Sequence, residues 1–471
     1  MENRSFFLNG INAETGDYLT PPLSARQVAA LARGESLNPE TRVDIQVWLR
    51  QGKKGLRSGD ARDLAQAGWG ILFGRDDPQT GAIREALKPL LDRRRSEAGG
   101  RREHYYRELY GRKGVWPGDT KRSFLSRHGV GAGSVDPDRM SYYLLIIGDP
   151  ETIPWEFQYQ LDMQYAVGRI WFETPEEYGV YAQNVVDAEA SLGQRAKTAA
   201  FFAPQNTDDE ATKLSAYQLA APLAKRMKGH GWTVREAVGE TATKARLREL
   251  LGGAETPDLL FTAGHGTVFP SGDPRQLPYQ GAVLCQDWPG PKVWKGKIPP
   301  DFYFSGEDVN GSDRLRGLVT FHFACYSAGG PAWDDFSIER GQKAVAPHPF
   351  IARLPHRLLQ KGALASIGHV ERAWQCSIEW GEEEKTQHIE AFEDFVDRLV
   401  SGHPIGSAME PFGQRYADLS TELSAKLEEI QTSKTPDEAG LASLWTDNHD
   451  ARNYVVLGDP AVRLVAWDGQ P

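Results

Sequence analysis

The sequence predicts an α/β protein, a three-layer sandwich in which helices cover both faces of a mostly parallel sheet. Beyond residue 140, short continuous apolar runs alternate with amphipathic segments, which is the pattern of buried strands joined by helices. The chain has 471 residues, and single cores rarely grow beyond about 250 to 300, so more than one structural unit is expected. A content of 40% hydrophobic and 25% charged residues is typical of a globular protein and excludes general disorder.

Net charge, hydropathy and cysteine content argue against several classes of function. The formal charge of -10 disfavours binding to phosphate backbones, so no direct nucleic-acid partner is expected. No signal-peptide core and no membrane-length apolar run is found, which predicts a cytoplasmic protein without membrane insertion. The three cysteines are odd in number and form no CxxC pair, so we expect neither a disulfide framework nor a metal site, and no cofactor.

Residues 1–98 are predicted to be a small mixed N-terminal segment of unassigned role. Periodicity predicts helices at residues 24–33 and 81–95, and the apolar run at residues 69–73 predicts a short strand. Nothing in this segment indicates a chemical function.

Residues 99–139 are predicted to be a linker and lead-in, and residues 140–471 to be the main domain. The boundaries are placed at two stretches rich in glycine and charged or turn residues, at 93–102 and 129–138.

The main domain supplies the alternating pattern. Strands are expected at residues 142–147, 199–202, 259–262, 318–323 and 363–367. Helices are expected at residues 216–228, 243–251 and 349–360. Two long insertions, at 266–316 and 327–347, begin at strand ends, where sites form in sheets of this kind. Within the second, the charged stretch 333–343 is interpreted as a solvated surface loop in preference to an activation or substrate loop.

Two strand ends carry the candidate chemistry. One apolar strand delivers His265 between two glycines, and another ends on Cys325 followed by small residues and glycines. If the two strands are neighbours, imidazole and thiol converge at one edge of the sheet. A thiolate nucleophile with a histidine to take its proton is suited to acyl transfer, and the backbone N–H groups of Gly266 and Cys325 are the expected oxyanion donors.

Taken alone, His265 or Cys325 would be interpreted as a structural residue, since cysteines at strand ends are usually inert small hydrophobes. The pairing of the two at glycine-flanked strand ends is what favours chemistry. His322 is a competitor that alternation places on the opposite face of its strand from Cys325, so it is interpreted as structural.

Residues 142–464 resemble the caspase-like clan CD cysteine peptidases, in particular the gingipain-like and bacterial CHAT peptidases. The resemblance depends on His265 and Cys325 and on several short motifs. These motifs are Gly148-Asp149, Ile153-Pro154, Gly168-Arg169-Ile170 and Gly458-Asp459-Pro460.

The resemblance implies a caspase-like fold and further site residues. By similarity, Asp162 and Trp374 line an S1 pocket, with the carboxylate pairing with a basic P1 side chain. By similarity also, Glu156 is a third group that orients His265. No aspartate lies two residues before Cys325, where metacaspases have one.

The predicted function is a cysteine endopeptidase that cleaves a protein substrate. We expect the N-terminal segment or a separate activating or inhibitory protein to gate the site, and the resemblance implies work in bacterial defence or cell death. Two alternatives remain: a catalytically silent caspase-like interaction module and a flavodoxin-like ligand-binding domain. The second lacks a phosphate-binding glycine loop after a strand.

Overall fold

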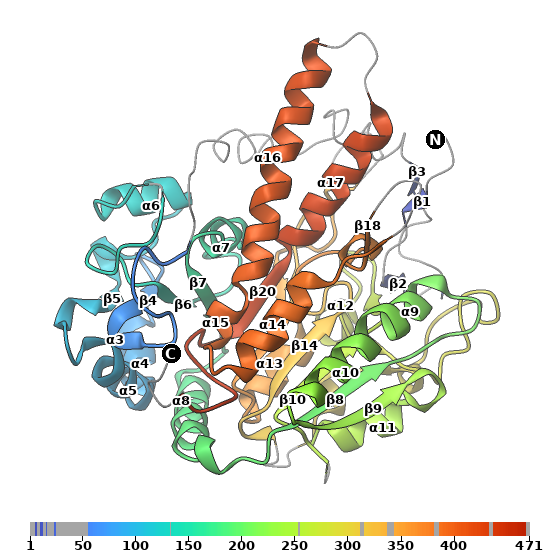
Figure 1. Ribbon diagram of the computed structural model, residues 1–471, viewed down its shortest axis with the longest axis horizontal. Coiled ribbons are helices and arrows are strands. Elements are labelled where there is room, and N and C mark those ends of the chain that lie inside the picture. The colour runs from blue at the N-terminus through green and yellow to red at the C-terminus, as the bar shows by residue number, and fades with distance from the viewer. Residues whose placement is uncertain are drawn as a thin grey trace.

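The computed structural model describes residues 5–6, 10–12, 16, 23–24, 55–131, 133–252, 255–310, 315–336, 343–380, 386–432 and 437–467. A ten-stranded sheet crosses the molecule, with helices on both faces (Figure 1). This confirms the predicted α/β sandwich. Of the helix expected at residues 24–33, residues 25–33 lie outside the described residues, and Ser24 is part of a short strand.

The spatial order of the sheet is β5 (Tyr106–Leu109), β4 (Trp69–Phe73), β6 (Tyr143–Ile147), β7 (Ala166–Ile170), β20 (Tyr454–Gly458), β17 (Ala365–His369), β14 (Val319–Phe323), β10 (Leu259–Ala263), β8 (Thr198–Ala203) and β9 (Thr233–Val238). The first five strands are mutually parallel, and so are the last five. The two sets meet where β17 and β20 pair antiparallel. The carboxyl ends of β10, β14 and β17 therefore lie together, beside the start of β20.

Helices pack on each face as right-handed crossovers require. One face carries α10 (Ala221–Gly229), α14 (Glu390–Val400), α15 (Ile405–Ala408) and α16 (Glu410–Thr432), which precedes α17 (Glu438–Arg452). The other carries α4 (Thr80–Ala86), α5 (Lys88–Gly99), α8 (Pro175–Ala190), α11 (Lys244–Leu250) and α13 (Arg353–Gln360). The shorter helices are α3 (Leu64–Ala67), α6 (Lys121–Arg127), α7 (Trp155–Asp162), α9 (Glu210–Leu214) and α12 (Gln276–Tyr279). Among the described helices, none combines the length and apolar character needed to cross a membrane.

The main hydrophobic core runs from Leu64 to Leu464 along the chain. It includes the strand at residues 69–73, which is β4 and pairs in parallel with both β5 and β6. The expected boundaries at residues 98 and 139 thus fall inside one sheet and one core. Local sequence patterns identify a strand but not its partner, which is why this continuity was not predicted.

The insertion after β10 builds a second, smaller sheet. Its order is β13 (Tyr303–Phe304), β12 (Val283–Leu284), β11 (Gly266–Val268) and β2 (Gly10–Asn12). A separate apolar cluster holds it together, including Ile11, Trp288 and Tyr303. The short pairs β1 (Ser5–Phe6) with β3 (Leu23–Ser24), β15 (Gly329–Gly330) with β16 (Phe350–Ile351), and β18 (Glu379–Trp380) with β19 (Thr386–Gln387) complete the described strands.

His322 is a buried core group whose Nδ1 lies 2.8 Å from the Thr262 hydroxyl on the adjacent strand. Burial lowers the pKa of His322 from 6.5 to about 4. Between these values the unfolded chain binds a proton that the folded chain does not, so stability is lost as pH falls through this window. We expect His322 to remove about 2 kcal/mol of unfolding free energy between pH 7 and pH 5.

Denaturant unfolding at the two pH values measures this effect. His322→Asn, which keeps a hydrogen-bonding group near Nδ1, should reduce the loss of stability between pH 7 and pH 5 by that amount. His348→Gln is the control, because its side chain is 70% exposed. Equal acid sensitivity in the wild type and His322→Asn would contradict the assignment.

Candidate active site

The ends of β10 and β14 place His265 and Cys325 on adjacent strands. The two strands are parallel with Ala263 opposite Phe323, and each candidate residue lies two positions further on. The Gly264 N–H still donates to the Phe323 carbonyl at 3.1 Å, so pairing continues toward the site. Both His265 and Cys325 are fully buried. The structure thus brings the two residues together at one edge of the sheet.

Gly266 forms the contact between these two strand ends. A Cβ atom built on Gly266 would lie 1.9 Å from the Cys325 carbonyl oxygen. This distance is too short for any side chain to be accommodated at position 266. Glycine is required here because the two backbones touch. This close approach keeps the Gly266 and Cys325 main chains, the expected source of oxyanion donors, against each other.

The imidazole of His265 is held by a buried carboxylate. His265 Nε2 lies 2.5 Å from Asp209 Oδ2, and neither side chain is exposed. The edge of the ring also packs against Trp288, with centroids 6.1 Å apart. A charge-assisted bond of this length fixes the ring orientation and directs Nε2 at the carboxylate.

Asp209 owes its position to the turn after β8. Its carboxylate caps α9, accepting from the Ala211 N–H at 3.2 Å, and Asp208 before it has a φ of 55°. Non-glycine residues seldom adopt that left-handed conformation, and aspartate is among those that tolerate it. Because β8 is the parallel neighbour of β10, the turn that follows β8 reaches His265.

Sequence reasoning missed Asp209 and favoured Glu156. Glu156 is exposed in the first turn of α7, whereas Asp209 is the carboxylate bonded to the His265 ring. The signal that could have found Asp209 is its place as a helix cap at the carboxyl end of the strand beside β10.

Cys325 is held as a neutral thiol. Burial raises the pKa of Cys325 to about 12, so at pH 7 the folded chain carries a thiol rather than a thiolate. The Ala373 N–H, just after β17, lies 3.2 Å from Sγ. Tyr326 follows with a φ of 58°, and its N–H donates to the Glu371 carbonyl at 2.7 Å. The chain therefore bends sharply at the nucleophile position toward residues 371–373.

A buried ionic cluster lies beside this bend. The Arg372 guanidinium makes two bonds of 2.8 Å to the Asp334 carboxylate and also pairs with Glu371. Arg452 donates to Asp335 at 2.7 Å. The expectation of a solvated loop at 333–343 is wrong for Asp334 and Asp335, whose side chains are 10% and 14% exposed.

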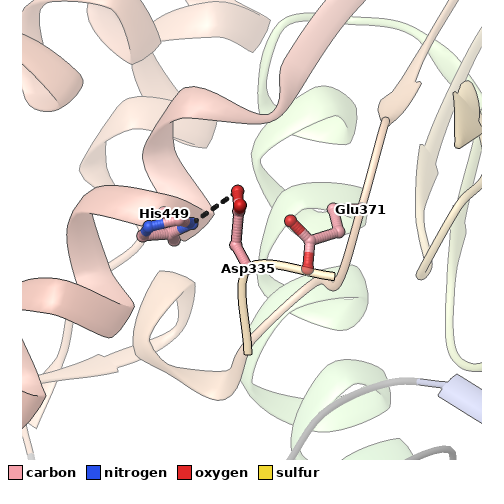
Figure 2. A group of neighbouring side chains, drawn as sticks. All are labelled: Asp335, Glu371 and His449. Atoms are coloured by element: carbon pink, nitrogen blue, oxygen red, sulfur yellow. Dashed lines mark ion pairs between the residues drawn. The ribbon is translucent and has the colours of Figure 1, made fainter. Parts of the chain in front are cut away.

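Part of this cluster has the geometry of a cation site. Asp335, Glu371 and His449 point toward one another, with potential ligand atoms within 4.8 Å (Figure 2). Arg452 already supplies positive charge there, because Nη2 lies 2.7 Å from Asp335 and 3.1 Å from His449 Nδ1. Burial raises the pKa of Glu371 to about 8. The trio is therefore interpreted as part of an arginine-linked structural network.

Asp162 and Trp374 occupy different surroundings. Asp162 ends α7 and lines a cavity of only about 20 Å³, and burial raises its pKa well above the usual range. The side chain of Trp374 is buried against Phe336, and the Trp374 backbone N–H donates to the Asp450 carboxylate at 2.8 Å. Trp374 is not among the described residues that line this small cavity. The two residues are not gathered into one open pocket.

A larger cavity of about 380 Å³ begins at Cys376, three residues beyond the Ala373 amide that contacts Cys325. It lies between α14, α16 and α17. Its lining carries five carboxylates, those of Glu390, Asp394, Asp418, Glu422 and Asp447. Arg415 also lines it, but its guanidinium is engaged by Ser377 at 3.0 Å and by Asp450 at 3.6 Å. The cavity is therefore strongly acidic.

Comparison with known proteins shows a distant likeness to a solved structure. No family model matches the chain, and no curated protein matches it. A solved structure described as "Structure of Protease" aligns with a TM-score of 0.46 and 13% identity, covering 85% of this chain and 79% of that chain.

Proposed function

We propose that this chain is a caspase-like cysteine endopeptidase with Cys325 as nucleophile and His265 as general base and acid. The observation that carries the proposal is the meeting of two adjacent strand ends, with Asp209 bonded to the imidazole at 2.5 Å. A nucleophile, a base beside it and a third group that orients the base form the usual arrangement of covalent catalysis. The two residues were predicted from sequence, and the orienting carboxylate is added by the geometry.

In the proposed reaction, His265 removes the proton of the Cys325 thiol through Nδ1, because Asp209 engages Nε2. The sulfur then attacks the scissile carbonyl, and the backbone N–H groups of Gly266 and Cys325 stabilise the oxyanion. The C–N bond breaks as the imidazolium returns its proton to the leaving amine. Water, deprotonated by the same imidazole, hydrolyses the thioester, releases the acid and restores the thiol.

Burial of Cys325 adds one requirement to this scheme. The thiol is fully buried and its pKa is raised to about 12, so the described conformation is a resting one. Residues 371–373 must move away from Sγ before a peptide carbonyl can reach it. We propose that access to this site is gated, which suits a peptidase present in the same compartment as many other proteins.

We further propose a preference for basic P1 side chains. The acid-lined cavity at Cys376 supports it, because its carboxylates would pair with a guanidinium or ammonium group. The S1 assignment of Asp162 and Trp374 stays a prediction from resemblance. A role in bacterial defence or cell death is likewise carried by the resemblance alone.

Hydrolysis of fluorogenic peptides that differ only at P1 tests the proposal. The wild type should cleave peptides with P1 Arg or Lys in preference to Asp, Leu or Met, and Cys325→Ala should cleave none. Asp394→Asn/Asp418→Asn should lower kcat/KM for P1 Arg about tenfold and leave a peptide with a neutral P1 residue unchanged. Glu249→Gln is the control, an exposed carboxylate on α11 outside the cavity.

Asp162→Asn separates the two possible S1 positions. A loss of P1 Arg cleavage in this variant, with the double variant unaffected, would place S1 at the small cavity expected from the sequence. Loss in neither variant would exclude both cavities as S1 and leave the peptidase proposal standing.

A catalytically silent interaction module is the second candidate. The observation that favours it is the full burial of Cys325 beneath residues 371–373. A thiol-directed probe distinguishes the two, because a silent module would leave Cys325 unlabelled in the presence of peptides, whereas a gated peptidase would expose it.

A further inference from the structure

The N-terminal strand β2 lies directly beside the candidate active site. Residues 10–12 pair in parallel with β11, in the register Gly10 with Gly266, Ile11 with Thr267 and Asn12 with Val268. In Figure 1, β2 lies on the side of the molecule away from β4 and β5. Residues 10–12 thus pair with the strand that begins immediately after His265.

The strand β11 connects β2 to both proposed catalytic residues. It starts at Gly266, whose backbone touches that of Cys325. On its other side it pairs with β12, and the Leu284 N–H there donates to the His265 carbonyl at 3.0 Å. An extended peptide bound along β11 would therefore have its main chain immediately beside the nucleophile.

Only β2 covers this side of β11 in the described part of the chain. Without β2, the main chain of β11 would become the edge of the small sheet. An unpaired edge presents N–H and C=O groups that bind extended peptides by adding a strand. The position of β2 is therefore that of a peptide bound at a strand-addition site.

The attachment of β2 is limited in extent. It pairs over three residues, and its described buried side chain is Ile11, which joins the small core with Trp288 and Ile298. Trp288 in turn packs against His265. Gly16 also contacts the same insertion, because a Cβ atom on Gly16 would lie 2.7 Å from the Gly296 carbonyl. A longer peptide with its own side-chain pockets could replace so short a strand.

We propose that β11 is the docking strand for the extended main chain of the substrate, and that β2 is its built-in occupant, which must be displaced before cleavage. This rests on the proposed peptidase function and adds to it the mode of substrate binding and the element that gates it. Gating by the N-terminal segment then has a physical form: residues 10–12 and the substrate compete for the same main-chain groups.

Undocking β2 in the full-length chain tests the proposal. Ile11→Asp places a charge in the small core and should release β2, which lowers KM for peptide substrates about tenfold if the docked state is about 90% populated. Ile298→Asp is the matched control, because it charges the same core from within the insertion and should not lower KM. A KM in Ile11→Asp that is unchanged or raised as in Ile298→Asp would overturn the proposal.

A binding measurement keeps this result separate from the fate of the peptidase proposal. In the Cys325→Ala/Ile11→Asp chain, the amides of residues 266 and 268 should exchange faster with solvent than in Cys325→Ala. These residues face β2, because the intervening Thr267 N–H donates to the Ala282 carbonyl on the β12 side. A synthetic peptide with the sequence of residues 5–16 should restore their protection. This readout needs no turnover, so it stands even if no peptide is ever cleaved. Failure of the peptide to protect these amides would show that β11 is not a strand-addition site.

Discussion

Replacing Cys325 with alanine is expected to lower peptide hydrolysis by roughly 10⁴-fold or more, because the thioacyl route disappears with the sulfur. His265→Ala should fall to nearly the same level. The double variant should be no worse than either single variant, because residues that act as one unit have effects that do not add. Steady-state rates with the preferred fluorogenic peptide measure all three.

Cys285→Ala is the matched control for this prediction. Cys285 is also a fully buried free cysteine, but it lies just after β12 of the small sheet, with its thiol donating to the Val283 carbonyl. Its replacement should leave the rate within about twofold of wild type, since a buried cysteine away from the reacting atoms acts as a small hydrophobe. Full activity in Cys325→Ala would show that another group carries the reaction.

Asp209→Asn is expected to lower kcat by roughly 10³- to 10⁴-fold with little change in KM. The asparagine keeps the shape of the side chain but removes the charge that stabilises the imidazolium, and it can present an N–H to the ring instead of an acceptor. The His265 ring would then favour the tautomer that cannot accept the thiol proton. Because Asp209 acts through His265 and does not touch substrate, its loss should appear in kcat.

Asp208→Asn is the matched control for Asp209→Asn. Asp208 is the preceding residue, exposed, and 3.7 Å from Lys292. Asparagine tolerates its positive φ of 55°, so the turn should keep its shape. Equal losses in both variants would indicate a general effect of the turn, and an unchanged kcat in Asp209→Asn would exclude the orienting role.

The strands that frame the site could be predicted because their sequences are unambiguous. The apolar runs that became β6, β8, β10, β14 and β17 are buried on both faces, so they lack the polar alternation of exposed strands. The pairing of β4 with β6 could not be predicted in the same way. It joins segments 74 positions apart, Trp69 with Tyr143, and only the assembled core selects it.

The candidate site residues also differ in whether local sequence is enough to identify them. His265 and Cys325 could be found because each combines a reactive side chain, a strand end and adjacent glycines within a few positions of the sequence. Asp209 lies 56 positions before His265, and its role depends on β8 being the neighbour of β10. The pairing of Asp334 with Arg372 could not be predicted from the sequence either. Charged residues in a loop are expected to be solvated, and the sequence does not show which of them has a buried partner.

The central claim, that Cys325 is the nucleophile of a peptidase, is tested most directly by covalent trapping. The full-length protein would be treated with a peptidyl chloromethyl ketone carrying P1 Arg, and the adduct located by intact mass and peptide mapping. We expect a single adduct on Cys325, slower formation in Asp209→Asn and none in Cys325→Ala. An adduct on Cys285 or Cys376, or peptide hydrolysis that persists without any adduct on Cys325, would contradict this claim.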